Sequence, residues 1–289
     1  MNNILNESKV LIEVENFVEE IALATKQPRN FYHTLTDLLI QFDQIYSVDF
    51  DYSASIGVFI ELELDFEAYL NDYDELFYQL KQSSFKQLQR DFKRYYQRQK
   101  RQLRDHRYSE SKNTEQLVKR MQRISERYAR ILVVRVDLAY PLNFQDRVNI
   151  QTFNDDMRVL RRRLQNQDTI FKGLIEYAWA LEQGEEKGYH CHLLLVYKGS
   201  ERRNAYWLAK QVGKLWSRIT KDQGCHFNCH GTAYLKQFSD RNRLGIGMIH
   251  RNNPDEVNNM LDTVAYLVRP EKEAQHLRVK TKKRMRTFG

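Results

Sequence analysis

The chain has few cysteines and no long apolar run, and both shortages narrow the classes of protein it can belong to. Its 289 residues include only three cysteines, Cys191, Cys225 and Cys229. An odd number this small forms no disulfide framework, which favours a reducing compartment. No apolar run reaches membrane-spanning length, and no basic segment followed by an apolar run opens the chain. We therefore expect a cytoplasmic protein without a signal peptide or a membrane partner.

Glycine is also scarce in the first 170 residues, where Gly57 is the only one. Tight hairpins favour glycine at their turns, so we expect none before Arg130. Apolar residues recur instead at helical spacing over residues 10–23 and 35–45. Residues 61–80 alternate acids with Leu, Phe and Tyr, as one further amphipathic helix would. The sequence thus predicts a mainly helical N-terminal region over residues 1–128.

Positive charge is absent from the start of the chain and concentrated after it. The net charge is +8, but residues 1–80 carry −13, residues 81–130 carry +11 and the remainder carries +10. A basic surface of this kind suits a polyanionic partner, although charged helix faces are often merely solvated. We expect nucleic acid to contact the last two-thirds of the chain.

The pattern changes at Arg130. Residues 131–138 form a β-branched run that ends before Tyr140-Pro141, which predicts a strand. Helices are expected over 146–166, 205–217 and 255–268, strands over 173–181 and 189–197, and two or three short strands within 224–250. This order predicts an α+β domain over residues 129–289, in which helices flank an antiparallel sheet.

Three candidate metal ligands fall on the one clear hairpin. The turn from Gly184 to Gly188 is centred on Glu186, so the symmetric register pairs Glu182 with His190. Side chains alternate along a strand, so His192 lies on the same face as His190. Two imidazoles and a carboxylate would then meet on one patch of sheet, a donor set able to hold Mg²⁺, Mn²⁺ or Zn²⁺. A pair of solvent-facing histidines is the simpler alternative.

Other carboxylates compete with Glu182 for this place. Glu185 and Glu186 lie in the turn, where geometry is loose. Glu176 has the same parity but lies roughly 20 Å further back at the rise of a strand. We therefore favour Glu182.

A tyrosine on the last helix is a candidate nucleophile. One face of this helix carries the apolar residues Val257, Met260, Leu261, Val264 and Val268. Tyr266 falls on the opposite side, with Arg269 close by. A guanidinium there can hold a phosphate and favour the phenolate. Tyr266 can equally be an ordinary half-exposed aromatic. Tyr234, expected in a strand, is a rival nucleophile.

Two further groups of residues are candidates for binding. Four possible zinc ligands fall between Cys225 and His230, although ligands so close in sequence rarely complete a tetrahedron. Basic residues with interleaved aromatics can guide single-stranded DNA, although such aromatics are more often part of a core. They are Lys93, Arg94 and Arg98 with Tyr95 and Tyr96, and Arg202 and Arg203 with Tyr206 and Trp207.

These motifs resemble those of the HUH endonucleases. His190-Cys191-His192 is similar to the His-hydrophobic-His strand of that superfamily, with Glu182 as the preceding acidic residue, and Tyr266-Leu267-Val268-Arg269 resembles its Tyr-x-x-Lys motif. Within the superfamily, the chain is most similar to filamentous-phage (inovirus-type) replication initiators and their prophage relatives. Three further segments carry this likeness: Val134–Leu138, including Arg135, then Leu244–Ile249, and Arg286–Gly289. The likeness covers roughly residues 129–289.

The resemblance implies a specific activity. A metal ion, Mg²⁺ or Mn²⁺, would be held by His190, His192 and Glu182, and Tyr266 would nick single-stranded DNA or a hairpin origin through a 5′-phosphotyrosine link. Arg135 would contact the DNA, and a host helicase and polymerase would follow. Arg269 stands where lysine is usual; it can grip a phosphate but cannot donate a proton as lysine does. The alternatives are a relaxase, a single-tyrosine transposase, or a non-catalytic DNA-binding regulator on the same fold.

Overall fold

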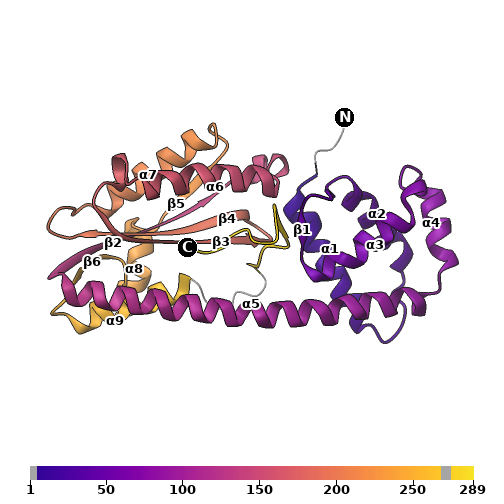
Figure 1. Ribbon diagram of the computed structural model, residues 1–289, viewed down its shortest axis with the longest axis horizontal. Coiled ribbons are helices and arrows are strands. Elements are labelled where there is room, and N and C mark those ends of the chain that lie inside the picture. The colour runs from indigo at the N-terminus through magenta and orange to yellow at the C-terminus, as the bar shows by residue number, and fades with distance from the viewer. Residues whose placement is uncertain (1–4, 268–274) are drawn as a thin grey trace. The chain divides into compact units, whose positions relative to one another are not determined.

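The structure, a computed structural model, describes residues 5–267 and 275–289. It is α+β with an antiparallel sheet and a helical N-terminal region, which confirms the predicted fold class (Figure 1). No helix among the described residues is long and apolar enough to cross a membrane. The chain divides into two compact units. Unit 1 contains residues 1–106, 145–151 and 277–285, and unit 2 contains residues 107–144, 152–276 and 286–289.

Unit 1 is built from helices around an aromatic core. Its main helices are α1 (Glu7–Leu23), α2 (Phe31–Asp43), α3 (Gly57–Asp65), α4 (Tyr73–Gln82) and the first part of α5 (Phe85–Arg127). Short elements join them: β1 (Asp51–Tyr52), η1 (Ala54–Ile56) and η2 (Glu67–Tyr69). Phe17 stacks on Phe31 with ring centroids 6.0 Å apart and meets Phe59 and Phe92 edge-on. Such buried aromatic contacts dominate the stability of a small core.

A segment distant in sequence joins unit 1 through a strand pairing and an ion pair. Strand β1 pairs with β7 (Val279–Lys280), with Asp51 opposite Lys280. The buried Arg278 guanidinium lies 2.6 Å from the Glu15 carboxylate. The C-terminal segment 277–285 is therefore part of the helical unit.

One helical prediction in this region is wrong. Residues 61–80 are not a single helix, because the chain leaves α3 after Asp65 and starts α4 at Tyr73. Asp72 caps the new helix: its side chain accepts a hydrogen bond of 3.0 Å from the backbone N–H of Glu75. The backbone N–H groups in the first turn of a helix have no partner within the helix, and an N-cap side chain pairs one of them.

Unit 2 is a sheet with helices on both faces. Its strands are β2 (Arg130–Ala139), β3 (Leu174–Gly184), β4 (Gly188–Lys198), β5 (Cys225–Asn228) and β6 (Gly247–His250). The order is β3-β4-β2, and β5 and β6 share the other edge of β2, all pairs being antiparallel. The helices are the last part of α5, α6 (Ile150–Gln165), α7 (Ala205–Ile219), α8 (Thr232–Ser239) and α9 (Pro254–Leu267), with η3 (Leu142–Arg147) and η4 (Thr169–Phe171) as connections.

Helices α6 and α7 cover the first sheet face (Figure 1). Arg161 of α6 lies over the Trp179 ring at 5.1 Å, and Phe153 of the same helix stacks on Tyr189 at 5.6 Å. Trp216 of α7 donates a 3.0 Å hydrogen bond to the Ala139 carbonyl. Residues of odd parity on β3 and β4 therefore face these helices.

The second face is covered by α5, α8 and α9. Its apolar core joins Leu117 and Met121 of α5 and Met260, Val264 and Leu267 of α9 to sheet residues. The sheet residues are Ile131, Val133, Ala178, Ala180, Leu194 and Val196. Because Ala180 lies opposite His192 and Leu194 lies two residues further along β4, this face is also the one that bears the histidines.

Candidate metal centre

The β3–β4 hairpin has the register that the sequence predicts. Glu182 lies opposite His190, and the pairing continues to Gly184 opposite Gly188. Gly188 adopts φ 56°, a left-handed conformation that side chains rarely take, which lets the chain reverse within the short turn. The hairpin therefore sets the three candidate ligands on one face by local geometry alone.

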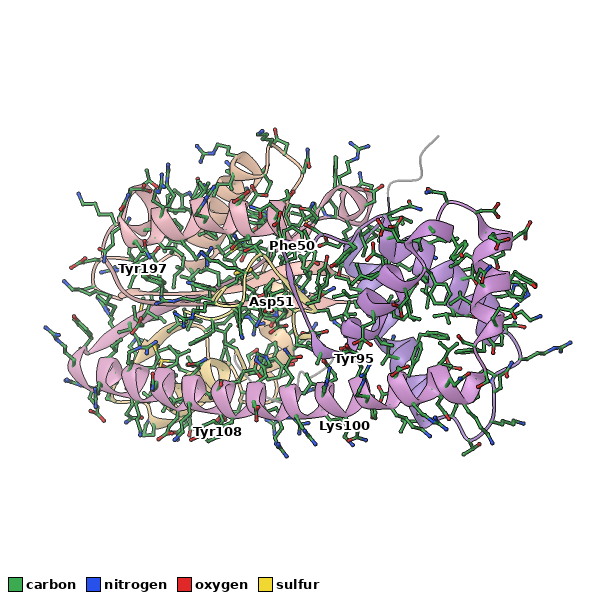
Figure 2. The ribbon with its side chains drawn as sticks, turned by 45° about the vertical axis from the view of Figure 1, so that its right-hand side comes forward. Phe50, Asp51, Tyr95, Lys100, Tyr108 and Tyr197 are labelled. Atoms are coloured by element: carbon green, nitrogen blue, oxygen red, sulfur yellow. The ribbon has the colours of Figure 1, made fainter. Side chains whose placement is uncertain are left out.

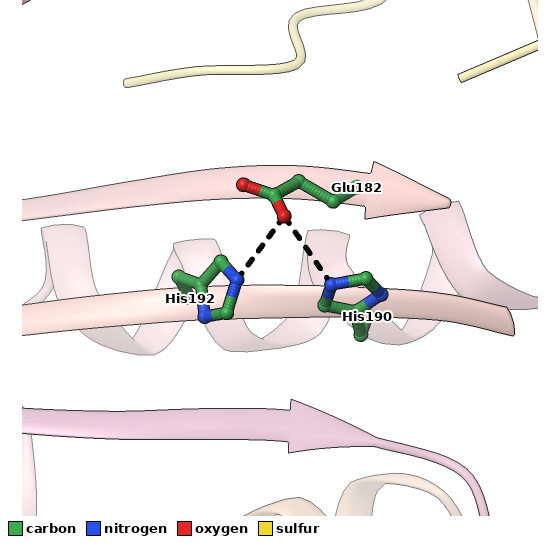
Figure 3. Close-up of side chains that lie close together, drawn as sticks. All are labelled: Glu182, His190 and His192. Carbon is green, nitrogen blue, oxygen red and sulfur yellow. Dashed lines mark hydrogen bonds and ion pairs between the residues drawn. The ribbon is translucent and has the colours of Figure 1, made fainter. Parts of the chain in front are cut away.

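The three side chains converge, as Figure 3 shows. Glu182 Oε2 lies 3.4 Å from His190 Nε2 and 3.2 Å from His192 Nε2. One ligand atom from each residue lies within 4.8 Å of the others. Their exposed fractions are only 7% for Glu182, 2% for His190 and 4% for His192. The prediction that these residues meet is confirmed.

The other nitrogen of each ring, Nδ1, lies within hydrogen-bond distance of an acceptor. His190 Nδ1 lies 3.0 Å from the Gly188 carbonyl oxygen, which can only accept, so this nitrogen carries the hydrogen. His192 Nδ1 lies 2.7 Å from Asp137 Oδ1 of the neighbouring strand β2. Arg135 Nη2 also lies 3.4 Å from His192 Nδ1, but a guanidinium nitrogen can only donate. We therefore assign the hydrogen to Nδ1, which donates it to the nearer Asp137 carboxylate.

When both rings are neutral, none of the three facing atoms therefore carries a proton. Two Nε2 lone pairs and a carboxylate oxygen point at one another, an arrangement that requires positive charge between them. A metal ion satisfies it, and histidine ligands in metal sites characteristically donate their other N–H to a carboxylate or a carbonyl. The three side chains thus fit a divalent metal ion, with coordination positions left for other ligands.

The electrostatics agree with this assignment. Burial by itself would lower the pKa of His192, but its hydrogen bonds to Asp137 and Glu182 raise that pKa above the ordinary value. Burial would likewise raise the pKa of Asp137, yet the hydrogen bond from His192 and the charges of Arg135 and Lys187 lower that pKa well below its usual range. Asp137 is therefore ionised, and the raised pKa of His192 favours a proton on this ring, with which a metal ion would compete.

Asp137 and the surroundings of Arg135 were missed by sequence reasoning as parts of the metal centre. Arg135 is 8% exposed and its Nε lies 3.3 Å from Asp137 Oδ1. Its backbone N–H donates to His230 Nε2 at 3.0 Å, and burial lowers the pKa of His230 to about 4, which keeps that ring a neutral acceptor. The sequence did contain a signal for this pair: Arg135 and Asp137 are charged residues separated by one position within an otherwise apolar strand.

The candidate nucleophiles lie on helices that cover the metal-bearing face. Tyr266 is among the residues that the structure describes, and its side chain is 45% exposed. It lies on the side of α9 away from the buried Val264 and Leu267. Arg269 lies outside the described residues. Tyr234 is in α8, so the expectation of a strand there is wrong. Burial raises the pKa of Tyr234 and Arg135 opposes that rise.

The other expected DNA-binding residues lie apart from the metal centre or in the other unit. Arg202 and Arg203 follow the far end of β4, and Arg202 donates to the Lys172 carbonyl at 3.2 Å. Lys93, Arg94 and Arg98 belong to unit 1, where Arg94 pairs with Glu61 at 2.6 Å. Helix α5 carries further exposed cations, among them Lys100 and Lys112, and the Lys112 ammonium lies 5.5 Å from the Tyr108 ring. Figure 2 labels Lys100 and Tyr108. Their contact with DNA remains a prediction.

No second group of metal ligands appears among the described residues. Cys225 and His226 point to opposite faces of β5, and the His226 ring packs against Gly213 of α7. Alternation along the strand thus separates Cys225 from His226 as candidate zinc ligands.

Comparison with known proteins places the chain in a family. The profile of the YagK/YfjJ C-terminal domain matches residues 93–289, more than half of the chain. The chain belongs to this family. The YagK/YfjJ match covers every strand of the sheet from β2 to β6 and the whole metal centre.

Two curated relatives share a short segment with this YagK/YfjJ-family chain. They are the initiator protein NS1 of porcine parvovirus strain NADL-2 and that of strain Kresse, each 49% identical over 37 residues. This segment is 13% of the chain and 6% of each relative, so the chain spans a small part of their length. No solved structure matches the chain.

Proposed function

We propose that this protein is a metal-dependent endonuclease of the HUH type that nicks and rejoins single-stranded DNA. In this role it initiates rolling-circle replication of a phage or another mobile element. The observation that carries the proposal is the buried Glu182–His190–His192 set, whose two rings are oriented by Gly188 and Asp137. The resemblance of its motifs and the short match to parvoviral initiator proteins support the same conclusion.

In the proposed reaction, the protein's groups position one phosphodiester. Glu182, His190 and His192 would hold Mg²⁺ or Mn²⁺, which withdraws charge from the phosphate oxygens when bound. Tyr266 loses its phenolic proton, its oxygen forms a bond to phosphorus, and the bond from phosphorus to the 3′ oxygen breaks. The 3′ oxygen gains a proton and becomes the primer terminus. Attack by a 3′-hydroxyl reverses these steps and rejoins the strand.

Basic residues would hold the strand during this exchange. Arg135 is the cation beside the metal centre, and Arg269 is proposed to grip the phosphate attacked by Tyr266. Lys93, Arg94, Arg98, Arg202 and Arg203 are proposed to contact the backbone further away. Residues 129–289 are proposed as the nuclease domain, residues 1–128 as the helical region, and a host helicase and polymerase as partners.

The test is formation of a covalent protein–DNA adduct. Single-stranded oligonucleotides with a random core and a 3′-fluorescein are incubated with the protein and Mn²⁺ or Mg²⁺, then separated on a denaturing gel. We expect a fluorescent protein band with either metal and none with a chelator. Tyr266→Phe should abolish the band, whereas Tyr206→Phe, which alters an exposed tyrosine of α7, should leave it unchanged.

Two results would overturn parts of the proposal. An adduct that persists in Tyr266→Phe and vanishes in Tyr234→Phe would make Tyr234 the nucleophile. A protein that binds the oligonucleotides but forms no adduct with any divalent metal would be the non-catalytic regulator. Mn²⁺ should also raise the thermal unfolding temperature of the wild type and not of His192→Ala, since ligand binding stabilises the folded state.

A further inference from the structure

Helix α5 presents a row of cations along one side of its first part, which belongs to unit 1. Between Lys86 and Arg104 this part of the helix carries eight cations and a single acid, Asp91. At roughly 100° per residue, six of these cations fall within an arc of about 100° around the helix axis. They are Lys86, Arg90, Lys93, Lys100, Arg101 and Arg104, and all six are exposed. We call this set the α5 stripe.

The opposite side of the same helix packs into the core of unit 1. Leu88 and Phe92 are buried there, and the Phe92 ring meets Phe17 and Phe59 edge-on. Burial of this side fixes the rotation of α5 about its axis and therefore holds the stripe toward solvent. A helix that lies on a lipid surface needs a free apolar side to insert. The α5 stripe therefore does not suit a membrane.

The stripe lacks counter-charges from the protein. The ion pairs on this part of α5 use the neighbouring Arg94, which lies 2.6 Å from the Glu61 carboxylate and 3.2 Å from that of Asp91. None of the six stripe cations takes part in an ion pair between residues that the structure describes. Residues 1–80 of the same unit carry a net charge of −13, which repels a polyanion. A polyanion that approaches unit 1 is therefore directed to the stripe.

The aromatic residues of this segment are not free to stack on bases. Tyr95 is 8% exposed, and its hydroxyl donates a hydrogen bond to Glu61. The Tyr96 hydroxyl donates to Glu19 at 2.8 Å, and the Lys100 ammonium lies 5.6 Å from the centre of the Tyr96 ring. Proteins that bind single strands combine cations with stacking aromatics. The α5 stripe offers only the cations, which contact phosphates whatever the base.

The shape of the stripe matches the backbone of a duplex. Lys86 and Arg104 are about 27 Å apart along the axis at the rise of an α-helix, which is the length of about eight base pairs. A duplex is straight over this distance, because its persistence length is about 500 Å, and it carries one negative charge per about 1.7 Å. A straight row of solvent-exposed cations is therefore complementary to it in form and in charge.

We propose that the α5 stripe binds the phosphate backbone of double-stranded DNA without reading its sequence. The surface lies in unit 1, whereas the metal centre lies in unit 2. The inference goes beyond the proposed function, because duplex binding at this helix requires neither the metal ion nor cleavage. It gives the helical unit the role of holding the protein on duplex DNA.

The salt dependence of duplex binding tests the proposal. Two blunt twenty-base-pair duplexes of unrelated sequence, each labelled with 5′-fluorescein, are titrated with the full chain by fluorescence anisotropy in the presence of a chelator. Each phosphate contact contributes about 0.9 to the slope of log Kd against log salt concentration. The triple variant Arg90→Gln, Lys93→Gln, Arg101→Gln should lower this slope by about 2.7 on both duplexes. Its Kd at about 0.1 M salt should rise by up to roughly 500-fold.

Matched variants separate the stripe from the net charge. The triple variant Lys26→Gln, Arg29→Gln, Lys81→Gln removes the same charge from exposed positions of unit 1 outside α5 and should leave the slope unchanged. The double variant Arg90→Lys, Arg101→Lys keeps both charges and should retain the wild-type slope. Thermal unfolding is measured alongside, and all three variants should unfold as the wild type does, because glutamine and lysine are good helix formers.

Four results would overturn the assignment. An unchanged slope in the α5 variant would show that duplex DNA does not contact the stripe, and an equal loss in the control variant would reduce the effect to net charge. A comparable loss with a sixteen-residue oligothymidylate would make the stripe a single-strand site. An α5 variant that binds the duplexes normally but loses binding to phosphatidylserine vesicles would make it a membrane surface. Because the assay contains a chelator, a wild type that forms no covalent adduct would refute the nuclease proposal and leave this inference standing.

Discussion

Replacing Asp137 with asparagine tests whether the second histidine is oriented for a metal ion. In the folded protein, Asp137 Oδ1 accepts a 2.7 Å hydrogen bond from His192 Nδ1, and both side chains are largely buried. Asparagine keeps the size of the group and an acceptor oxygen but removes the charge. The Asp137→Asn variant should therefore keep the fold and hold Mn²⁺ less tightly.

The expected loss follows from the kind of bond that is changed. Hydrogen bonds to charged groups contribute about 1.5–3 kcal/mol and neutral ones about 0.5–1.5 kcal/mol. The difference of about 1–1.5 kcal/mol corresponds to roughly tenfold in affinity. This agrees with the lower end of the 10- to 100-fold losses that are typical when a partner of a metal ligand is replaced.

Isothermal titration calorimetry with Mn²⁺ measures this affinity directly. Glu176→Gln is a matched control, because it removes a carboxylate from β3 that pairs with Arg120 at 2.9 Å rather than with the histidines. The control should bind Mn²⁺ as the wild type does. An Asp137→Asn variant that is folded and binds Mn²⁺ as tightly as the wild type would refute the role of Asp137 in orienting His192.

Two further predictions concern stability. Burial lowers the pKa of His230 to about 4, below the ordinary value of about 6.5, so the unfolded chain takes up a proton first as the pH falls. The wild type should lose up to about 3 kcal/mol between about pH 6.5 and about pH 4, and urea unfolding of His230→Gln should show a smaller loss. At Gly245, an added Cβ would overlap the backbone oxygen of Asn259 and the Thr263 side chain, so Gly245→Ala should cost about 1–3 kcal/mol. Gly231→Ala, whose Cβ would lie 3.6 Å from the Asn228 carbonyl oxygen, should change stability by only a few tenths of a kcal/mol, and equal losses for the two variants would contradict the clash.

Local patterns were sufficient where an element depends on its own residues. The β-branched run after Arg130, the glycine-flanked turn and the apolar spacing of the last helix predicted β2, the hairpin and α9. They failed between residues 61 and 80, where capping by Asp72 starts a new helix, and around Tyr234, where short apolar segments are ambiguous between strand and helix. The continuous α5 helix and the boundary of the units within it also follow from packing rather than from any glycine or proline signal.

The sequence by itself determined which side chains of one hairpin share a face, because strand alternation and the symmetry of a short turn allow only one register that joins Glu182, His190 and His192. Only the tertiary structure decided what surrounds them. Asp137 meets His192 because β2 pairs with β4 across more than fifty residues of chain, and Phe288 pairs with Ala180 because the end of the chain returns to the edge of β3. Such pairings depend on how the whole sheet buries its two faces, and no local window of sequence contains that information.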